Sequence, residues 1–207
     1  MTAARHDEDP QTLFHPSIGC PGETVIYIPH NLHTLRHASS STSASISLEE
    51  DAPRIEVTVP PASIHNIFAH RQWRAGMLLA DLIYSTSQVA TWDESHLLLN
   101  LRDKRVLELG AGTGLPGIMA AQEQASSTRT DAQARMMRAQ QVVLSDYDEA
   151  ELITRLKVNV KTNTLHCMTK TSGVGHIWGQ DVSDLLDVLL PTPHSPPSDL
   201  PLKFDVV

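Results

Sequence analysis

The chain has 207 residues, a formal net charge of −8 at pH 7 and 41% hydrophobic residues, which suits one domain of ordinary size. The acidic balance argues against nucleic acid as the main partner, because phosphate binding needs a basic face. No run approaches the ~18 apolar residues of a membrane-spanning helix, and the N-terminus lacks a signal-peptide pattern. Cys20 and Cys167 are too few for a disulfide framework. We therefore expect a cytoplasmic monomer with neither nucleic-acid nor membrane partners.

The N-terminal part of the chain predicts two short strands. Residues 24–28 (TVIYI) are rich in β-formers, and residues 54–59 (RIEVTV) alternate apolar and polar side chains. The Ser-rich stretch HASSSTSASIS between them predicts a loop, so the strands would form a hairpin with a long connection. We place a domain boundary after residue 53, with a polar, partly disordered segment over 1–53 and the main domain over 54–207.

Residues 71–84 (RQWRAGMLLADLIY) predict a helix. Four residues recur at helical spacing and would form its buried face: Trp73, Met77, Ala80 and Tyr84. On this spacing alone, core packing is the better interpretation of Trp73. A polar linker follows, and residues 97–101 would continue as helix.

From Arg105 onward, short apolar runs alternate with helical segments. The expected strands are Arg105–Leu109 (RVLEL), 142–144 (VVL), a weak strand before Gly175, and the start of another at 204–207 (FDVV). The expected helices are 118–124, 149–160 and 184–190. Pro116 suits the first turn of the first of these helices, where a missing N–H costs nothing. This alternation is typical of an α/β fold with a parallel sheet.

A glycine-rich turn joins the first of these strands to the next helix. It holds four glycines within eight residues: Gly110, Gly112, Gly114 and Gly117. Glycines let a ligand approach the main chain closely, and such a turn presents backbone N–H groups at a helix N-terminus. Because a simple tight turn needs only one glycine, four of them favour a ligand-binding loop.

Two ligand patterns overlap in this turn. Gly112-x-Gly114-x-x-Gly117 matches the dinucleotide fingerprint, and Glu108-x-Gly110-x-Gly112-x-Gly114 matches the pattern for S-adenosylmethionine (AdoMet). In the dinucleotide frame the strand would continue to Ala111 and bury Glu108, which costs on the order of several kcal/mol for an unpaired carboxylate. In the AdoMet frame Glu108 ends the strand and faces the cationic amino-acid part of AdoMet. A pyrophosphate would be repelled there, so the sequence favours AdoMet over NAD.

Two later residues suit other parts of AdoMet. Asp146 ends the second strand, where its carboxylate can accept hydrogen bonds from both ribose hydroxyls, although a helix N-cap is an alternative role. Trp178, in HIWGQD, can stack on the adenine or pack in the core. The eleven histidines are scattered and form no Cys/His cluster, so no metal site is predicted.

Residues 73–207 resemble the nicotinamide N-methyltransferase-like group of seven-β-strand methyltransferases, which includes lysine methyltransferases and the fungal protein N-terminal and lysine methyltransferase of elongation factor 1-alpha. The matching blocks are QWRAGMLLADLI, RVLELGAGTGLPGIMAA, VVLSDYDEAELITRLKVNV, HIWGQD and FDVV. The resemblance implies a Rossmann-like fold, with AdoMet contacts from Glu108, Gly110, Gly112, Asp146 and Trp178 and from the Trp73 segment. The glycine motif adds Gly114 to these predicted cofactor contacts.

The resemblance also implies methyl transfer to a protein lysine or N-terminal amine, with elongation factor 1-alpha as the type of substrate. A nicotinamide or other small-molecule methyltransferase and a non-catalytic AdoMet-binding fragment stay open as alternatives. Residues 126–138 lengthen one connection with polar residues, and the acidic and aromatic motif that lines the family's acceptor pocket does not follow Val207. We therefore expect an incomplete sheet of about four strands and a chain that is marginally stable and inactive by itself. The catalytic residues are unknown from the sequence, because the resemblance implies that they lie beyond residue 207.

Overall fold

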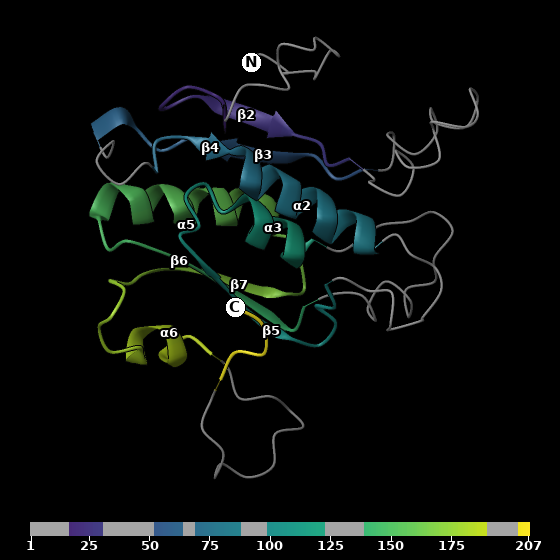
Figure 1. Ribbon diagram of the computed structural model, residues 1–207, viewed down its shortest axis with the longest axis vertical. Coiled ribbons are helices and arrows are strands. Elements are labelled where there is room, and N and C mark those ends of the chain that lie inside the picture. Colours follow the sequence, from purple (N-terminus) through teal and green to yellow (C-terminus); the bar gives the residue numbers. More distant parts are fainter. Residues whose placement is uncertain (1–16, 31–51, 64–68, 88–98, 123–138, 190–202) are drawn as a thin grey trace, which may run out of the picture.

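The computed structural model describes residues 17–30, 52–63, 69–87, 99–122, 139–189 and 203–207. The Ser-rich loop, the polar insertion at 126–138, most of the N-terminal segment and residues 97–98 lie outside these residues. Residues 99–101 are described and are not helical, so the predicted continuation of the helix over 97–101 was wrong there. The described elements stack in layers, with a strand pair on one side, helices in the middle and a second sheet below them (Figure 1). This mixed α/β architecture agrees with the fold class predicted from the alternating segments.

The lower layer is a parallel sheet in the order β5 (Arg105–Leu109), β6 (Gln141–Asp146) and β7 (Lys170–Gly175). All residues of β6 are buried, as expected for a parallel strand that is covered on both faces. At the other edge of β5, Val206 forms an isolated parallel bridge with Val106, and the N–H of Leu107 donates to the carbonyl of Val206 (2.9 Å). The predicted strands therefore lie side by side, with their carboxyl ends at one edge of the sheet.

Helices cover both faces of this sheet. On one face lie α3 (Leu115–Ala121), which is buried at every residue, and α5 (Ala150–Thr164). They form the main core with the β6 side chains that point the same way, Val142 and Leu144. On the opposite face, α6 (Ser183–Asp187) contributes Leu185 to a smaller cluster. Helix α3 begins three residues before the predicted start at 118, and α5 continues about one turn beyond the predicted end at 160.

The upper layer is the predicted hairpin. Strands β2 (Thr24–Tyr27) and β3 (Ile55–Thr58) pair antiparallel, from Thr24 opposite Thr58 to Tyr27 opposite Ile55. The pairing therefore joins residues on both sides of the boundary predicted after residue 53. The hairpin lies on α5, where Asn163 accepts from the N–H of Glu56 (2.9 Å) and donates to its carbonyl (2.7 Å).

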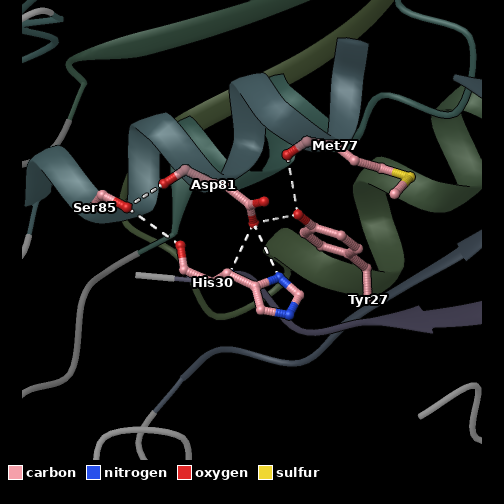
Figure 2. A network of polar contacts seen from close by, with 5 residues as sticks. All are labelled: Tyr27, His30, Met77, Asp81 and Ser85. Carbon is pink, nitrogen blue, oxygen red and sulfur yellow. Dashed lines mark hydrogen bonds and ion pairs between the residues drawn. The ribbon is translucent and has the colours of Figure 1, made fainter. Parts of the chain in front are cut away.

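A polar cluster joins the hairpin to α2 (Arg74–Ser87), as Figure 2 shows. The carboxylate of Asp81 accepts from the hydroxyl of Tyr27 and from the main-chain N–H of His30 (2.8 Å). The Tyr27 hydroxyl also lies 3.0 Å from the carbonyl of Met77, and the Ser85 hydroxyl donates to the carbonyl of His30 (3.2 Å). Burial, followed by the charge of Asp81, raises the pKa of Tyr27, so its hydroxyl stays protonated as a donor.

The predicted placement of Trp73 in a helix was wrong. The helix begins at Arg74, because Gln72–Trp73 form β4, which pairs antiparallel with β1 (Ser17–Ile18). Trp73 is 40% exposed, whereas Ala80 and Tyr84 occupy the buried face that the spacing predicted. Pairing with a distant segment therefore removes Trp73 from the helical pattern and from the core.

None of the helices within the described residues is both long and apolar enough to cross a membrane.

Candidate functional site

A cavity of about 640 Å³ opens at the carboxyl ends of β5 and β6, a size typical of small-molecule sites. Its walls come from the start of α2, the glycine turn, the end of β6 and the segment after β7. Six of the seven residues predicted to bind a cofactor line it: Trp73, Glu108, Gly110, Gly112, Asp146 and Trp178. The fold thus gathers residues that lie more than 100 positions apart in the sequence.

Gly114, the seventh predicted residue, is not among those that line the cavity. Its φ is +81°, and a Cβ there would lie 2.8 Å from both Leu144 and Leu156. Gly112, with φ +54°, would place a Cβ with nothing within 4 Å. The two glycines therefore serve different purposes, because Gly114 allows the turn to pack on the core and Gly112 faces open space.

Glu108 lies at the carboxyl end of β5, since the strand stops at Leu109 and does not reach Ala111. Its carboxylate accepts a hydrogen bond from the N–H of Gly117 (2.8 Å) in the first turn of α3. A dinucleotide would bring its pyrophosphate to the start of that helix. Because the side chain of Glu108 already occupies this position and accepts from the N–H of Gly117, the geometry disfavours the dinucleotide alternative.

The electrostatics of Glu108 suit a cationic ligand group. Burial raises its pKa from the usual 4.5 to about 8; the hydrogen bond from Gly117 opposes this shift, and the charge of Asp146 adds to it. A positive group entering the cavity would stabilise the ionised carboxylate. The site therefore holds a carboxyl group whose charge depends on what is bound.

This raised pKa predicts a pH dependence of stability. Between about pH 4.5 and 8 the folded chain keeps the Glu108 proton that the unfolded chain has lost, so this group's contribution to stability falls as pH rises through that window. We expect the fall in the free energy of unfolding from pH 5.5 to 8 to be smaller in Glu108→Gln than in the wild type. Urea unfolding at both pH values measures it, and equal falls in the two proteins would contradict the assignment.

Asp146 ends β6, and both of its carboxylate oxygens accept backbone hydrogen bonds. Oδ2 accepts from the N–H of Gly112 (2.6 Å), and Oδ1 accepts from the N–H of Tyr147 (2.7 Å). The alternative role as a helix N-cap was wrong, because Glu149 caps α5 by accepting from the N–H of Leu152 (2.8 Å). Each Asp146 oxygen still has a lone pair for another donor, so hydrogen bonding to ribose hydroxyls stays a prediction.

Trp178 stands at the mouth of the cavity. It is 70% exposed, so the core-packing alternative was wrong. Its ring lies over the glycine turn, 3.7 Å from where a Cβ of Gly110 would be. Trp73, which lies in β4 directly before α2, also lines the cavity. Two indoles are therefore available to contact a flat ligand group.

Sequence reasoning missed three buried polar residues in the cavity wall: Gln72, Thr113 and His176. The N–H of His176 donates to the carbonyl of Asp146 (2.8 Å), which joins the end of β6 to the segment after β7. Gln72 and Thr113 lie inside the matching sequence blocks, next to Trp73 and between two glycines. These positions beside predicted cofactor residues were thus the only signal in the sequence that could have identified Gln72 and Thr113 as part of the site. Among the described residues, no group of three metal-ligating side chains occurs.

Comparison with known proteins places this geometry in a family context. Residues 62–191 match a family described as lysine methyltransferase. The chain is 30% identical over 131 residues to the protein N-terminal and lysine N-methyltransferase of Schizosaccharomyces pombe, covering 63% of this chain and 41% of that protein. For the enzyme of the same description in Cryptococcus neoformans, the identity is 28%, with 69% and 39% covered. A histone-arginine methyltransferase of Xenopus laevis is 29% identical, with 76% and 52% covered.

The chain thus spans about two fifths of the length of the two fungal relatives and about half of the Xenopus laevis protein. The matched stretch includes the whole glycine turn, the end of β6 and Trp178.

Proposed function

The chain belongs to the lysine methyltransferase family, and we propose that it binds AdoMet in the cavity at the carboxyl ends of β5 and β6 and acts in methyl transfer to a protein amine. The observation that carries the proposal is the arrangement of Glu108, Asp146 and Trp178 around one cavity. Each matches a different part of AdoMet, and the carboxylate of Glu108 disfavours a pyrophosphate in the same space.

In this proposal, Glu108 meets the ammonium of the methionine part, directly or through water. Asp146 accepts hydrogen bonds from the ribose hydroxyls, while the backbone N–H of Gly112 keeps one of its oxygens in place (2.6 Å). The indole of Trp178 covers a face of the adenine. Gly110 and Gly112 allow close approach of the ligand, and Trp73 closes the cavity from the α2 side.

The chemistry is a direct displacement. A nitrogen lone pair of the acceptor amine forms a bond to the methyl carbon as the carbon–sulfur bond breaks, and the electron pair of that bond stays on sulfur. The methylated ammonium then loses a proton, and S-adenosylhomocysteine is the other product. Alignment of the two reactants supplies most of the rate, provided that the amine is neutral. We assign none of the described residues to deprotonating the amine.

The acceptor we propose is a lysine or N-terminal amine of a protein, with elongation factor 1-alpha as the type of substrate. Support comes from the relatives described as protein N-terminal and lysine N-methyltransferases. We further propose a cytoplasmic monomer, and we propose that its parallel strands β5, β6 and β7 form part of a Rossmann-like sheet. A small-molecule acceptor and a non-catalytic AdoMet-binding module are the alternatives.

Transfer of tritiated methyl from AdoMet tests this function. The purified protein is incubated with elongation factor 1-alpha, with a protein extract and, separately, with nicotinamide. The sequence alone predicted an inactive chain, but the structure gathers six of the seven predicted cofactor residues around one cavity. We therefore expect label in a discrete protein band and, after hydrolysis, in methyl-lysine or in the N-terminal residue. Label in methyl-arginine or in nicotinamide alone would contradict the proposed acceptor. AdoMet binding without any transfer would favour the non-catalytic alternative.

The exposed indole at the cavity mouth gives a specific prediction. Trp178→Ala should weaken AdoMet binding by about 1–3 kcal/mol, the usual contribution of stacking. The melting temperature should stay unchanged, because the side chain is 70% exposed. Leu165→Ala is the matched control, since Leu165 is 68% exposed and is not among the residues that line this cavity. Titration calorimetry and a thermal melt measure both quantities, and equal affinities in the two variants would rule out the stacking role.

A further inference from the structure

Thr113, in the middle of the glycine turn, is held from two sides by buried amide side chains. It is 1% exposed, and its hydroxyl donates to the side-chain carbonyl of Gln72. Its main-chain carbonyl accepts from the side-chain amide of Asn159 on α5 (3.0 Å). Gln72 is 5% exposed and Asn159 is 2% exposed. A turn rich in left-handed glycines is thus fixed by hydrogen bonds from outside itself.

Asn159 connects this turn to the N-terminal hairpin. Its amide oxygen accepts from the N–H of Thr58 (2.9 Å), and its amide nitrogen donates to the carbonyl of Thr58 (3.0 Å). Asn163, one helical turn later, makes the same pair of bonds to Glu56 of β3. Within the described part of the chain, Asn159 also donates to the glycine turn, whereas Asn163 donates to the carbonyl of Asn159. The two asparagines therefore form a matched pair.

Gln72 connects the turn to the segment that carries Trp73. Its amide nitrogen donates to the carbonyl of Trp73 (3.1 Å). The first turn of α2 has Gly76 beside it, where a Cβ would lie 2.8 Å from that nitrogen. Glycine in a helix costs about 0.5–1 kcal/mol relative to alanine. At position 76 this cost is offset, because glycine leaves room for the side-chain amide of Gln72.

These bonds form one chain of contacts from the hairpin to the cavity, and its middle members Asn159, Thr113 and Gln72 are buried. It runs from Thr58 through Asn159, Thr113 and Gln72 to the carbonyl of Trp73. Its last three residues, Thr113, Gln72 and Trp73, line the cavity. The neighbouring Gly112 is in turn bonded to Asp146 (2.6 Å). Any shift of Thr113 would therefore move groups on two walls of the cavity.

We infer that Gln72 and Asn159 are positioning residues, which fix the glycine turn and the Trp73 segment in the arrangement that receives AdoMet. The inference rests on the proposed function, because the ligand is the one proposed for this cavity. It assigns a role to the N-terminal hairpin as well, since Asn159 anchors the turn to β3.

Titration of AdoMet into four variants tests the inference: Gln72→Met, Thr113→Val, the double variant and Thr113→Ser. Each of the first two removes the side-chain bond, and we expect each to weaken AdoMet binding about tenfold, because it leaves a buried partner unsatisfied. The double variant should bind like Gln72→Met, about tenfold and not a hundredfold more weakly than the wild type, since the side-chain bond that Thr113→Val removes is already lost in Gln72→Met. Thr113→Ser keeps the hydroxyl and should bind within about twofold of the wild type.

Asn159→Leu and Asn163→Leu form the control pair. Both lose bonds to β3 and should melt at lower temperature, but only Asn159→Leu removes the bond to Thr113. We expect weakened AdoMet binding in Asn159→Leu alone, measured at a temperature where thermal melts show each variant fully folded. Wild-type affinity in Gln72→Met and Asn159→Leu under these conditions would overturn the inference, and so would equal weakening in both asparagine variants.

Amide hydrogen exchange separates this inference from the proposed function. In Gln72→Met, protection of the Gly114 N–H, which donates to the carbonyl of Ala111 (2.7 Å), should fall while β6 stays protected. A uniform change over the whole chain would indicate a purely structural role and overturn the inference. If the wild type binds no AdoMet, the proposed function fails, and the exchange pattern still decides whether Gln72 fixes the turn.

Discussion

Gly114→Ala should lower the free energy of unfolding by about 2–5 kcal/mol, the sum of a left-handed backbone strain and a core overlap. The strain arises because φ is +81°, and the overlap arises because the new Cβ would lie 2.8 Å from Leu144 and Leu156. Urea unfolding of the two proteins measures the difference. The result would show that Gly114 holds the turn against the core.

Gly22→Ala provides the control for this prediction. Gly22 has the same φ of +81°, but a Cβ there would have nothing within 4 Å. It should therefore cost only the strain, about 1–2 kcal/mol. If both variants lose the same stability, the overlap with Leu144 and Leu156 contributes nothing, and the assignment of Gly114 to packing is wrong.

Asp146→Ala should weaken AdoMet binding by about 1.5–3 kcal/mol, the range for hydrogen bonds to a charged group. The physical reason is the loss of a carboxylate that would accept from the ribose and that now holds the N–H of Gly112 (2.6 Å). Titration calorimetry on the folded variant measures the change in affinity.

Glu149→Ala separates this binding effect from helix capping. Glu149 is acidic and close to Asp146 in the sequence, but it caps α5 through the N–H of Leu152 (2.8 Å). Its removal should cost about 1 kcal/mol of stability and leave the AdoMet affinity unchanged. An unchanged affinity in Asp146→Ala would show that Asp146 is not part of the ligand site.

The sequence was most informative where a local pattern fixes the structure. An apolar strand followed by glycines predicted the end of β5 and the cavity beside it, because both depend on neighbouring residues. Alternation in residues 54–59 likewise predicted β3, which pairs with β2. The position of Glu108 at the strand end also followed from its spacing to the glycines.

Other features depend on partners that no local pattern reveals. Trp73 leaves the helix because Gln72 and Trp73 pair with residues 17–18, more than 50 positions away. Gly114 fits a ligand motif by spacing, but the packing of Leu144 and Leu156 against it appears only in three dimensions. The sequence offered Asp146 as a cap of the next helix, and only the path of the chain assigns the capping bond to Glu149.

The most direct test of the central claim is a comparison of two ligands. Isothermal titration of the purified protein with AdoMet and, separately, with NAD measures which one occupies the cavity beside Glu108. We predict saturable binding of AdoMet at one site and no saturable heat with NAD. Saturable binding of NAD with no response to AdoMet would contradict the account.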